Sequence, residues 1–284
     1  MTQSKQNILS DAKYKELCDW FRKFRAVIVA YSGGVDSSLL LQAATEALGP
    51  ERVVGVTSCS ESLSEEALII AQEVARAQGF RHEIIEYSDL ELESYAANSV
   101  NRCYYCKKEL YQRLAAIAKE RGANVVVEGS NRDDEDDYRP GMQAAREKGV
   151  RSPLKELGIR KAQIREWAKR LGLPNWDLPS DPCLSSRFPY GRRITREGLG
   201  QVEACERFLR ENGFSQVRVR HCGDTARIEL PTDEMPRVFL ERGLREFIIE
   251  NIKGAGFIYV TIDLRGFRSG SLNEALGRET DSGE

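Results

Sequence analysis

The sequence predicts an α/β fold, in which a doubly wound parallel sheet is followed by a smaller C-terminal α+β domain. Apolar runs alternate with amphipathic segments in the first part of the chain, which is typical of parallel strands covered by helices. The first apolar run leads into a glycine-rich turn and a helix. A segment rich in Pro, Ser and Asp over 175–191 separates these elements from a second set. We therefore expect a larger domain over 1–187 and a smaller one over 188–284.

The individual elements follow from local patterns. Residues 26–30 are apolar without a break, as expected of a strand buried on both faces. Ser64 and the two glutamates after it provide a cap and an acidic first turn for a helix. In the larger domain we expect strands at 26–30, 52–57, 84–85 and 124–129, helices at 11–24, from the glycine-rich turn to Gly49, and at 64–79, 107–121 and 161–171, and irregular chain at 88–106. In the smaller domain we expect helices at 195–212 and 234–251 and strands at 217–220, 226–230 and 257–262.

Composition limits the functional classes. Of the 284 residues, 41% are hydrophobic and 30% are charged, which is the balance of a globular protein. No apolar run is long enough to cross a membrane and residues 1–10 are polar, so we expect a cytoplasmic protein with no membrane partner. The formal net charge is −2 with no block of Lys or Arg, which argues against a nucleic-acid partner. Seven cysteines, two of them in one Cys-x-x-Cys, favour metal or redox chemistry over a disulfide framework.

The turn between the first strand and its helix has the composition of an anion site. Its two glycines let the backbone approach a ligand closely, and the free N–H groups of the helix N-terminus face it. No Lys is present, so this is not the Gly-x-x-x-x-Gly-Lys loop. In a doubly wound sheet, ligands bind at the carboxyl ends of the strands, where Ser58 and the turn at Gly129 and Asn131 also fall. The residues of the glycine-rich turn are Ser32, Gly33, Gly34, Val35, Asp36, Ser37 and Ser38.

Three cysteines form the second group of interest. Cys103 and Cys106 lie just ahead of the helix expected from residue 107, whose N-terminus favours thiolates. Cys183 follows much later. A structural zinc usually has four ligands, whereas three thiolates suit a [4Fe–4S] cluster with one open iron. Spacing alone leaves open the alternative of three unrelated buried cysteines.

Two charged segments have both a functional and a structural interpretation. The acidic run over 133–137 follows a strand end, so its carboxylates either hold Mg²⁺ or form a solvated loop. Arg218 and Arg220 alternate with valines, which places both guanidinium groups on one face of a strand. That face either recognises a phosphate or is a solvated basic surface.

The glycine-rich turn resembles a motif of a whole superfamily, and the chain as a whole resembles one family within that superfamily. Ser-Gly-Gly-x-Asp-Ser resembles the PP-loop of the Rossmann-like ATP pyrophosphatases. The whole chain resembles the LarE-type ATP-dependent sulfur transferases (sulfur insertases), which build the nickel-pincer nucleotide cofactor of lactate racemase. The segments that carry this second resemblance are 32–37 (Ser-Gly-Gly-Val-Asp-Ser), 137–141 (Asp-Tyr-Arg-Pro-Gly), 185–191 (Ser-Ser-Arg-Phe-Pro-Tyr-Gly), 217–220 (Val-Arg-Val-Arg), 226–231 (Ala-Arg-Ile-Glu-Leu-Pro) and 266–270 (Gly-Phe-Arg-Ser-Gly).

The resemblance implies a reaction and its cofactors. ATP, with Mg²⁺, adenylates a carboxylate of pyridinium-3,5-biscarboxylate mononucleotide and releases pyrophosphate, and sulfur then displaces AMP to give a thiocarboxylate. Sacrificial members of the family donate a cysteine sulfur from the position of Pro182, which has no sulfur to give. Cys103, Cys106 and Cys183 match the cluster-type members instead, and our hypothesis is that the open iron carries sulfide from a separate donor. The family also implies a homo-oligomer, with a hexamer as one such assembly.

The resemblance also implies roles for single residues. Catalysis is assigned to Asp36, Cys183, Ser186 and Arg187, the cluster to Cys103, Cys106 and Cys183, the substrate phosphate to Arg218 and Arg220, and assistance to a cation to Glu206. ATP and its metal are assigned to Ser32, Gly33, Gly34, Val35, Asp36, Ser37, Ser38, Ser58, Gly129, Asn131 and Asp137.

Three other functions remain open at this stage. A tRNA thiolase would share the PP-loop and the three cysteines, but it would normally carry a basic surface or an RNA-binding module. An amide-forming synthetase of the PP-loop type would need an ammonia source. A non-catalytic ATP-binding subunit would bind the nucleotide without releasing pyrophosphate.

Overall fold

The computed structural model describes residue 8 and residues 10–136, 140–179, 182–268 and 270–278. The chain divides into two compact units. The first contains Met1–Leu92 and Asn101–Asp181, and the second contains Glu93–Val100 and Pro182–Glu284. The division therefore falls after Asp181, ahead of the boundary at 187/188 that the sequence analysis proposed, and a short segment from the first half of the chain joins the second unit.

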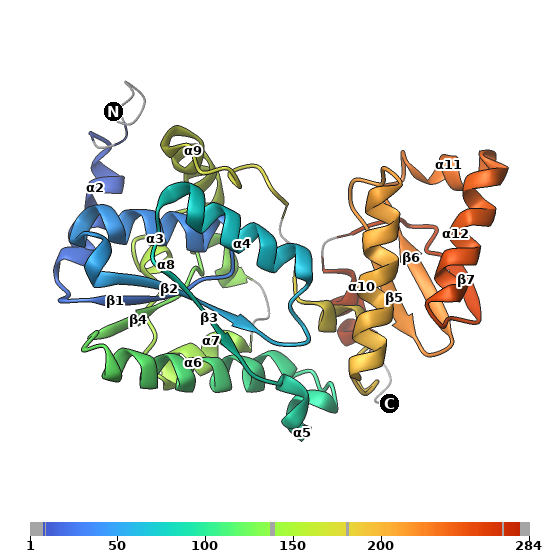
Figure 1. The fold of residues 1–284 in the computed structure, drawn as a ribbon, viewed down its shortest axis with the longest axis horizontal. Helices are drawn as coiled ribbons and strands as arrows, with labels where there is room; N and C mark the ends of the chain where they lie inside the picture. The colour runs from blue at the N-terminus through green and yellow to red at the C-terminus, as the bar shows by residue number, and fades with distance from the viewer. Residues whose placement is uncertain (1–7, 9, 137–139, 180–181, 269, 279–284) are drawn as a thin grey trace. The chain divides into compact units, whose positions relative to one another are not determined.

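The first unit is built on a four-stranded parallel sheet with the order β3-β2-β1-β4 (Figure 1). Val27 and Val29 pack with buried residues of the N-terminal helix and of the helix behind the glycine-rich turn. Ile28, on the opposite face, packs with a different group of helices. Helices cover both faces, which confirms the predicted doubly wound sheet. The strands are β1 (Val27–Ala30), β2 (Val53–Cys59), β3 (His82–Glu86) and β4 (Val125–Val127).

One helix of the first unit differs from its prediction in a way that matters for the site. It begins at Arg102, so the expectation of irregular chain up to residue 106 is wrong, and Cys103 and Cys106 lie in the helix rather than ahead of it. Ser64 caps its helix as predicted, since its hydroxyl accepts from the backbone N–H of Ala67 at 3.2 Å. The helices are α2 (Ala12–Arg22), α3 (Val35–Leu48), α4 (Glu65–Gln78), α6 (Arg102–Glu120), α7 (Gly141–Glu147), α8 (Pro153–Glu156) and α9 (Lys161–Leu171), with 3-10 turns η1 (Pro50–Arg52), η2 (Asp89–Glu91) and η3 (Arg132–Asp136).

The second unit is the predicted small α+β domain. Its three strands have the order β5-β6-β7, with β5 and β6 antiparallel and β6 and β7 parallel. The single helix expected over 234–251 is two helices, because the backbone at Glu241 (φ −92°, ψ 89°) leaves the helical region. The elements are α5 (Glu93–Ala96), η4 (Leu184–Arg187), α10 (Arg196–Glu211), β5 (Arg218–Cys222), β6 (Thr225–Glu229), α11 (Met235–Leu240), α12 (Arg242–Gly254), β7 (Tyr259–Ile262) and η5 (Ser271–Arg278).

The small sheet has one apolar and one charged face. Val219 and Ile228 are cross-strand partners and lie in the core with α10 and α12. Arg218 faces Glu229 in the register, and Arg220 faces Arg227. Directly opposed residues share a face of an antiparallel pair, so these four charged side chains lie together on the other face.

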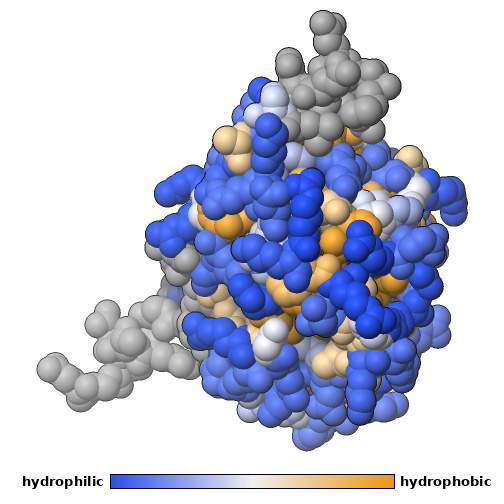
Figure 2. Space-filling model, turned by 90° about the vertical axis from the view of Figure 1, so that its left-hand side faces the viewer, coloured by the Kyte–Doolittle hydropathy of each residue, from blue (hydrophilic) through white to orange (hydrophobic). Residues whose placement is uncertain are grey.

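The protein surface fits the composition. Figure 2 shows a mainly hydrophilic face with small groups of hydrophobic residues between the charged ones. Within the described part of the chain, no helix is long and apolar enough to span a bilayer.

Candidate functional site

The glycine-rich turn is held in shape by its own hydroxyls. Gly33 has φ +76°, and a Cβ there would lie 2.8 Å from Ala71, so this position requires glycine. The backbone N–H of Ser32 donates to the Ser37 hydroxyl at 3.2 Å, and that hydroxyl donates to the carbonyl of Gly34 at 3.0 Å. The turn therefore presents the first N–H groups of α3 at the carboxyl end of β1, as an anion site requires.

Several predicted ligand residues meet at this turn. A Cβ on Gly129 would lie 3.2 Å from the backbone nitrogen of Ser37, so the loop after β4 passes close to the turn. Asn131 is buried, and its amide donates to the Asp36 carboxylate at 3.4 Å. Ser58 lies near the carboxyl end of β2. Val35 is a core residue, which leaves only its backbone for a ligand.

Lys161 is a residue of the site that the sequence analysis missed. It is the first residue of α9, and its ammonium group forms an ion pair with the carboxylate of Asp36. No local pattern predicts this contact, because the two residues lie 125 positions apart. The Asp36 carboxylate therefore contacts both the Asn131 amide and the Lys161 ammonium group. The PP-loop contains no Lys, and α9 provides a cation beside it.

The described carboxylates of the acidic run after β4 accept hydrogen bonds from neighbouring groups of the protein. Asp133 accepts from the Arg160 guanidinium and from the backbone N–H of Lys161, both at 2.8 Å. Asp134 accepts from the backbone N–H of Asn131 at 2.9 Å. These contacts fix the loop that carries Asn131 and the start of α9. Asp137, assigned to ATP and its metal, lies outside the described residues.

Asn175 stabilises the glycine-rich turn through hydrogen bonds from its buried side chain. It is 1% exposed, and its amide donates to the carbonyl of Gly33 at 2.6 Å and to the Ser38 hydroxyl at 2.9 Å. It lies in the segment rich in Pro, Ser and Asp, where no local pattern predicts a role for it. Its contacts hold the first and last parts of the turn at a fixed separation.

Replacing Asn175 with alanine should raise the Kd for ATP about tenfold, because the Gly33 carbonyl would lose a buried donor and the turn would loosen. Isothermal titration with ATP measures this. Asn212→Ala is the matched control, since Asn212 also donates its amide to a backbone carbonyl (Phe208, 2.8 Å), but in the second unit. An unchanged Kd in Asn175→Ala would show that the turn does not depend on this contact.

The cysteines fall into two classes. Burial raises the pKa of Cys18 and of Cys205 to about 12, as expected of packed thiols with no reactive role. Cys103 is exposed and Cys106 is half-buried. They are the second and fifth residues of α6, so the helix dipole favours a thiolate most at Cys103, and the i, i+3 spacing places both side chains on one side. This pair fits two thiolate ligands of a cluster.

The third cysteine, Cys183, is exposed and belongs to the second unit. Among the residues that the structure describes, no group of three or more His, Cys, Asp or Glu side chains is placed to hold a metal ion. The meeting of the three sulfurs therefore stays a prediction.

Arg187 organises the chain around Cys183. It has no exposed surface, and its guanidinium group forms two hydrogen bonds of 2.8 Å with the carboxylate of Glu206. The remaining nitrogen donates to the Cys183 carbonyl at 3.2 Å and to the Ser186 hydroxyl at 3.0 Å. Glu206, predicted to assist a cation, is fully buried and also accepts from the Val219 N–H at 2.9 Å. The cation that it faces here is the guanidinium group of Arg187.

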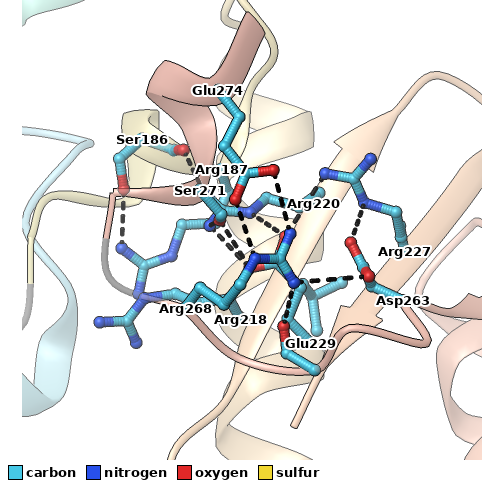
Figure 3. Close-up of polar contacts among 12 residues, drawn as sticks. Ser186, Arg187, Arg218, Arg220, Arg227, Glu229, Asp263, Arg268, Ser271 and Glu274 are labelled. Carbon is cyan, nitrogen blue, oxygen red and sulfur yellow. Dashed lines mark hydrogen bonds and ion pairs between the residues drawn. The ribbon is translucent and has the colours of Figure 1, made fainter.

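Arg218 and Arg220 lie on the charged face of the small sheet, among other arginines, carboxylates and hydroxyls (Figure 3). Arg220 pairs with Glu229 through hydrogen bonds of 2.9 and 2.7 Å, and donates to the Ser186 carbonyl at 2.7 Å. Arg218 lies over the Phe267 ring, 5.3 Å from its centroid. Its role and that of Arg220 toward a phosphate stay predictions.

The parallel sheet and the glycine-rich turn define a nucleotide-binding protein of the PP-loop type, and the profile of the NAD synthase family matches residues 15–125. An uncharacterized protein of Synechocystis sp. is 45% identical over 266 residues, which is 94% of this chain and 98% of that protein. Pyridinium-3,5-bisthiocarboxylic acid mononucleotide synthase of Lactiplantibacillus plantarum is 39% identical over 261 residues, 90% of this chain and 91% of the enzyme. An uncharacterized protein of Methanocaldococcus jannaschii is 33% identical over 250 residues (87% and 92%). The chain belongs to the family of pyridinium-3,5-bisthiocarboxylic acid mononucleotide synthase.

Proposed function

We propose that this protein is an ATP-dependent sulfurtransferase that acts on pyridinium-3,5-biscarboxylate mononucleotide. A carboxylate oxygen of the substrate attacks the α-phosphorus of ATP, the bond to the β-phosphate oxygen breaks, and pyrophosphate leaves with its metal. Sulfide then attacks the acyl carbon of the adenylate and AMP leaves with the C–O electron pair, so that a thiocarboxylate remains. The activation is needed because a carboxylate oxygen is a poor leaving group and AMP is a good one.

The observation that carries this proposal is the convergence of Asp36, Asn131 and Lys161 on the PP-loop. The N–H groups at the start of α3 suit the terminal phosphates of ATP. With ATP bound, Asp36 would organise the Mg²⁺ of the triphosphate, and Lys161 would exchange its carboxylate partner for the phosphates that leave. Family membership supports the same reaction.

The charged face of the second unit supports recognition of the substrate phosphate. Four arginines of the described chain lie there with three carboxylates, and Arg265 forms a further ion pair with Glu274, so positive charge is in excess. Ser186 connects this face to the Cys183 segment, because its carbonyl accepts from Arg220 and its hydroxyl from Arg187. The arginines are Arg218, Arg220, Arg227 and Arg268, and the carboxylates are Glu229, Asp263 and Glu274.

We assign sulfur delivery to a [4Fe–4S] cluster bound by Cys103, Cys106 and Cys183. The cluster would supply an iron with an open position for sulfide from a separate donor. The first two turns of α6 provide two of the thiolates, and Arg187 fixes the segment that provides the third. Pro182 excludes a sacrificial sulfur at its own position.

We also propose that the protein is a homo-oligomer. Exposed apolar side chains of the second unit support this: Phe239, Leu240, Phe247, Ile258, Tyr259 and Leu264.

Mass spectrometry and product analysis test the reaction. The purified protein is incubated with ATP, Mg²⁺, sulfide and pyridinium-3,5-biscarboxylate mononucleotide. We expect one AMP, one pyrophosphate and one thiocarboxylate per turnover, with the protein mass unchanged. Loss of H₂S from a cysteine would instead indicate a sacrificial donor. Pyrophosphate release that needs tRNA rather than the pyridinium nucleotide would indicate the thiolase, and no release with either would indicate a non-catalytic subunit.

Removing Cys183 should abolish the cluster, because two thiolates on one helix cannot hold it alone. Cys183→Ala is reconstituted anaerobically with iron and sulfide, and its visible absorbance and reduced-state EPR spectrum are compared with those of the wild type. Cys222→Ala, which removes a half-buried thiol outside the trio, should keep the full signal. An undiminished cluster in Cys183→Ala would contradict the assignment of this ligand.

A further inference from the structure

A buried carboxyl group near the carboxyl ends of β2 and β3 has no role in the reaction described above. Asp89 begins η2 and is 2% exposed. Its Oδ2 atom accepts from the Ser60 hydroxyl at 2.7 Å and lies 3.5 Å from that of Ser62, and the two hydroxyls are 3.1 Å apart. Its Oδ1 atom is buried without a hydrogen-bond partner. Burial raises the pKa of this carboxyl group.

The same oxygen of Asp89 also accepts from a cysteine. The Sγ atom of Cys106, the fifth residue of α6, lies 3.8 Å from Oδ2. Asp89 thus connects the loop after β2, which carries Ser60 and Ser62, to the start of α6. Three donors from two elements converge on a single oxygen of one side chain.

This arrangement differs from that of a carboxylate that only closes a loop. Asp133 uses both of its oxygens, one for the Arg160 guanidinium and one for the N–H of Lys161. Asp89 directs one oxygen at the thiol and two hydroxyls and leaves the other unsatisfied. Burying a carboxyl group in this way is unfavourable, and a neutral amide or hydroxyl could connect the two serines. Replacing Asp89 with such a neutral residue would change its contact with the Sγ atom of Cys106 more than its contacts with the two serines.

We propose that Asp89 is a positioning residue for Cys106, fixing the direction of its Sγ atom at the start of α6 so that the thiol is presented for iron binding beside Cys103. The part of this inference that concerns iron rests on the proposed function, in which Cys106 is a cluster ligand. Groups that hydrogen-bond to metal ligands orient them, and their loss weakens metal binding without removing a ligand. Ser60 and Ser62 in turn hold the carboxyl group that performs this role.

The test uses Asp89→Asn, which keeps the shape of the side chain, and Asp89→Ala, which removes it. In the metal-free protein, iodoacetamide labelling of Cys106 is followed by peptide mass spectrometry, with Cys103 of the same molecule as reference. In Asp89→Ala the ratio of the Cys106 to the Cys103 rate should rise about threefold or more, because the released thiol rotates freely. General loosening of the protein would raise both rates and leave the ratio unchanged. Glu86→Gln, an exposed carboxylate on β3, is the control.

Iron binding provides the second measurement. After anaerobic reconstitution, the variants should lose iron to a competing chelator at concentrations roughly tenfold to a hundredfold lower than the wild type does, with Asp89→Asn less affected than Asp89→Ala. A changed labelling ratio in a protein whose wild type binds no iron would support the positioning of Cys106 and overturn only the cluster. A different result would overturn the positioning role of Asp89 and leave the cluster in place. In that result the wild type binds the cluster, and both Asp89 variants have the same labelling ratio and the same iron affinity as the wild type.

Discussion

Replacing Lys161 with alanine should lower kcat for pyrophosphate release by about 10²- to 10³-fold. The ammonium group pairs with Asp36 at the mouth of the PP-loop, where the β- and γ-phosphates of ATP would lie. We expect its charge to stabilise the leaving pyrophosphate more than the bound ATP, because negative charge builds up on the leaving group as the bond breaks. The loss should therefore appear mainly in kcat, with a smaller effect on the KM for ATP. Steady-state pyrophosphate release with the pyridinium nucleotide as acceptor measures both.

The same helix provides a control for this prediction. Lys169 lies on α9 with its ammonium group 4.5 Å from the centre of the Trp176 ring, and Lys169→Ala should keep the wild-type rate. Lys161→Arg keeps a cation and should retain part of the activity. A Lys161→Ala variant with unchanged kcat would show that Asp36 and the backbone N–H groups suffice for the leaving group.

The sheet and the turn could be predicted because their signals are local. The strand before the turn is apolar on both faces, and the glycines and serines of the turn occur in consecutive positions, so a short window contains the whole motif. Cross-strand order has no such signal: nothing near β4 shows that it pairs with β1 rather than with β3. The sequence pattern does not indicate the start of α6, because Cys and Tyr are weak helix formers and the buried apolar residues (Leu110, Tyr111 and Leu114) begin only two turns later.

The contacts that complete the site are long-range and could not be predicted in the same way. The predicted helix over 161–171 correctly begins at Lys161, but the partner of that residue, Asp36, lies 125 positions earlier in the sequence. Asn175 lies in a segment without periodicity, so the sequence does not indicate that its side chain is buried against Gly33. The arginines of β5 were correctly placed on one face, but their carboxylate partners depend on a register that only the folded sheet defines.

Removing the guanidinium group of Arg187 should destabilise the second unit by about 3–5 kcal/mol, because Glu206 would stay buried without its paired cation. Among the described residues, Arg210 would remain as a cation 3.5 Å from that carboxylate, and the Val219 N–H would still donate to it at 2.9 Å. Urea unfolding of Arg187→Met measures the loss. Tryptophan fluorescence follows the first unit alone, since all three tryptophans (Trp20, Trp167 and Trp176) belong to it. The midpoint by far-UV circular dichroism should therefore fall while the fluorescence midpoint is kept.

Two further variants separate the buried charge from the lost packing. Arg187→Met combined with Glu206→Gln leaves no charge in the interior and should recover more than half of the lost stability. Arg193→Met removes an arginine from an ion pair in which both side chains are more than half exposed, so it should leave the unfolding curve unchanged. Because the same guanidinium group donates to the carbonyl of Cys183, the single variant should also lose iron more readily than the wild type does. A double variant no more stable than Arg187→Met would show that the packing of the arginine, and not the charge of Glu206, accounts for the loss.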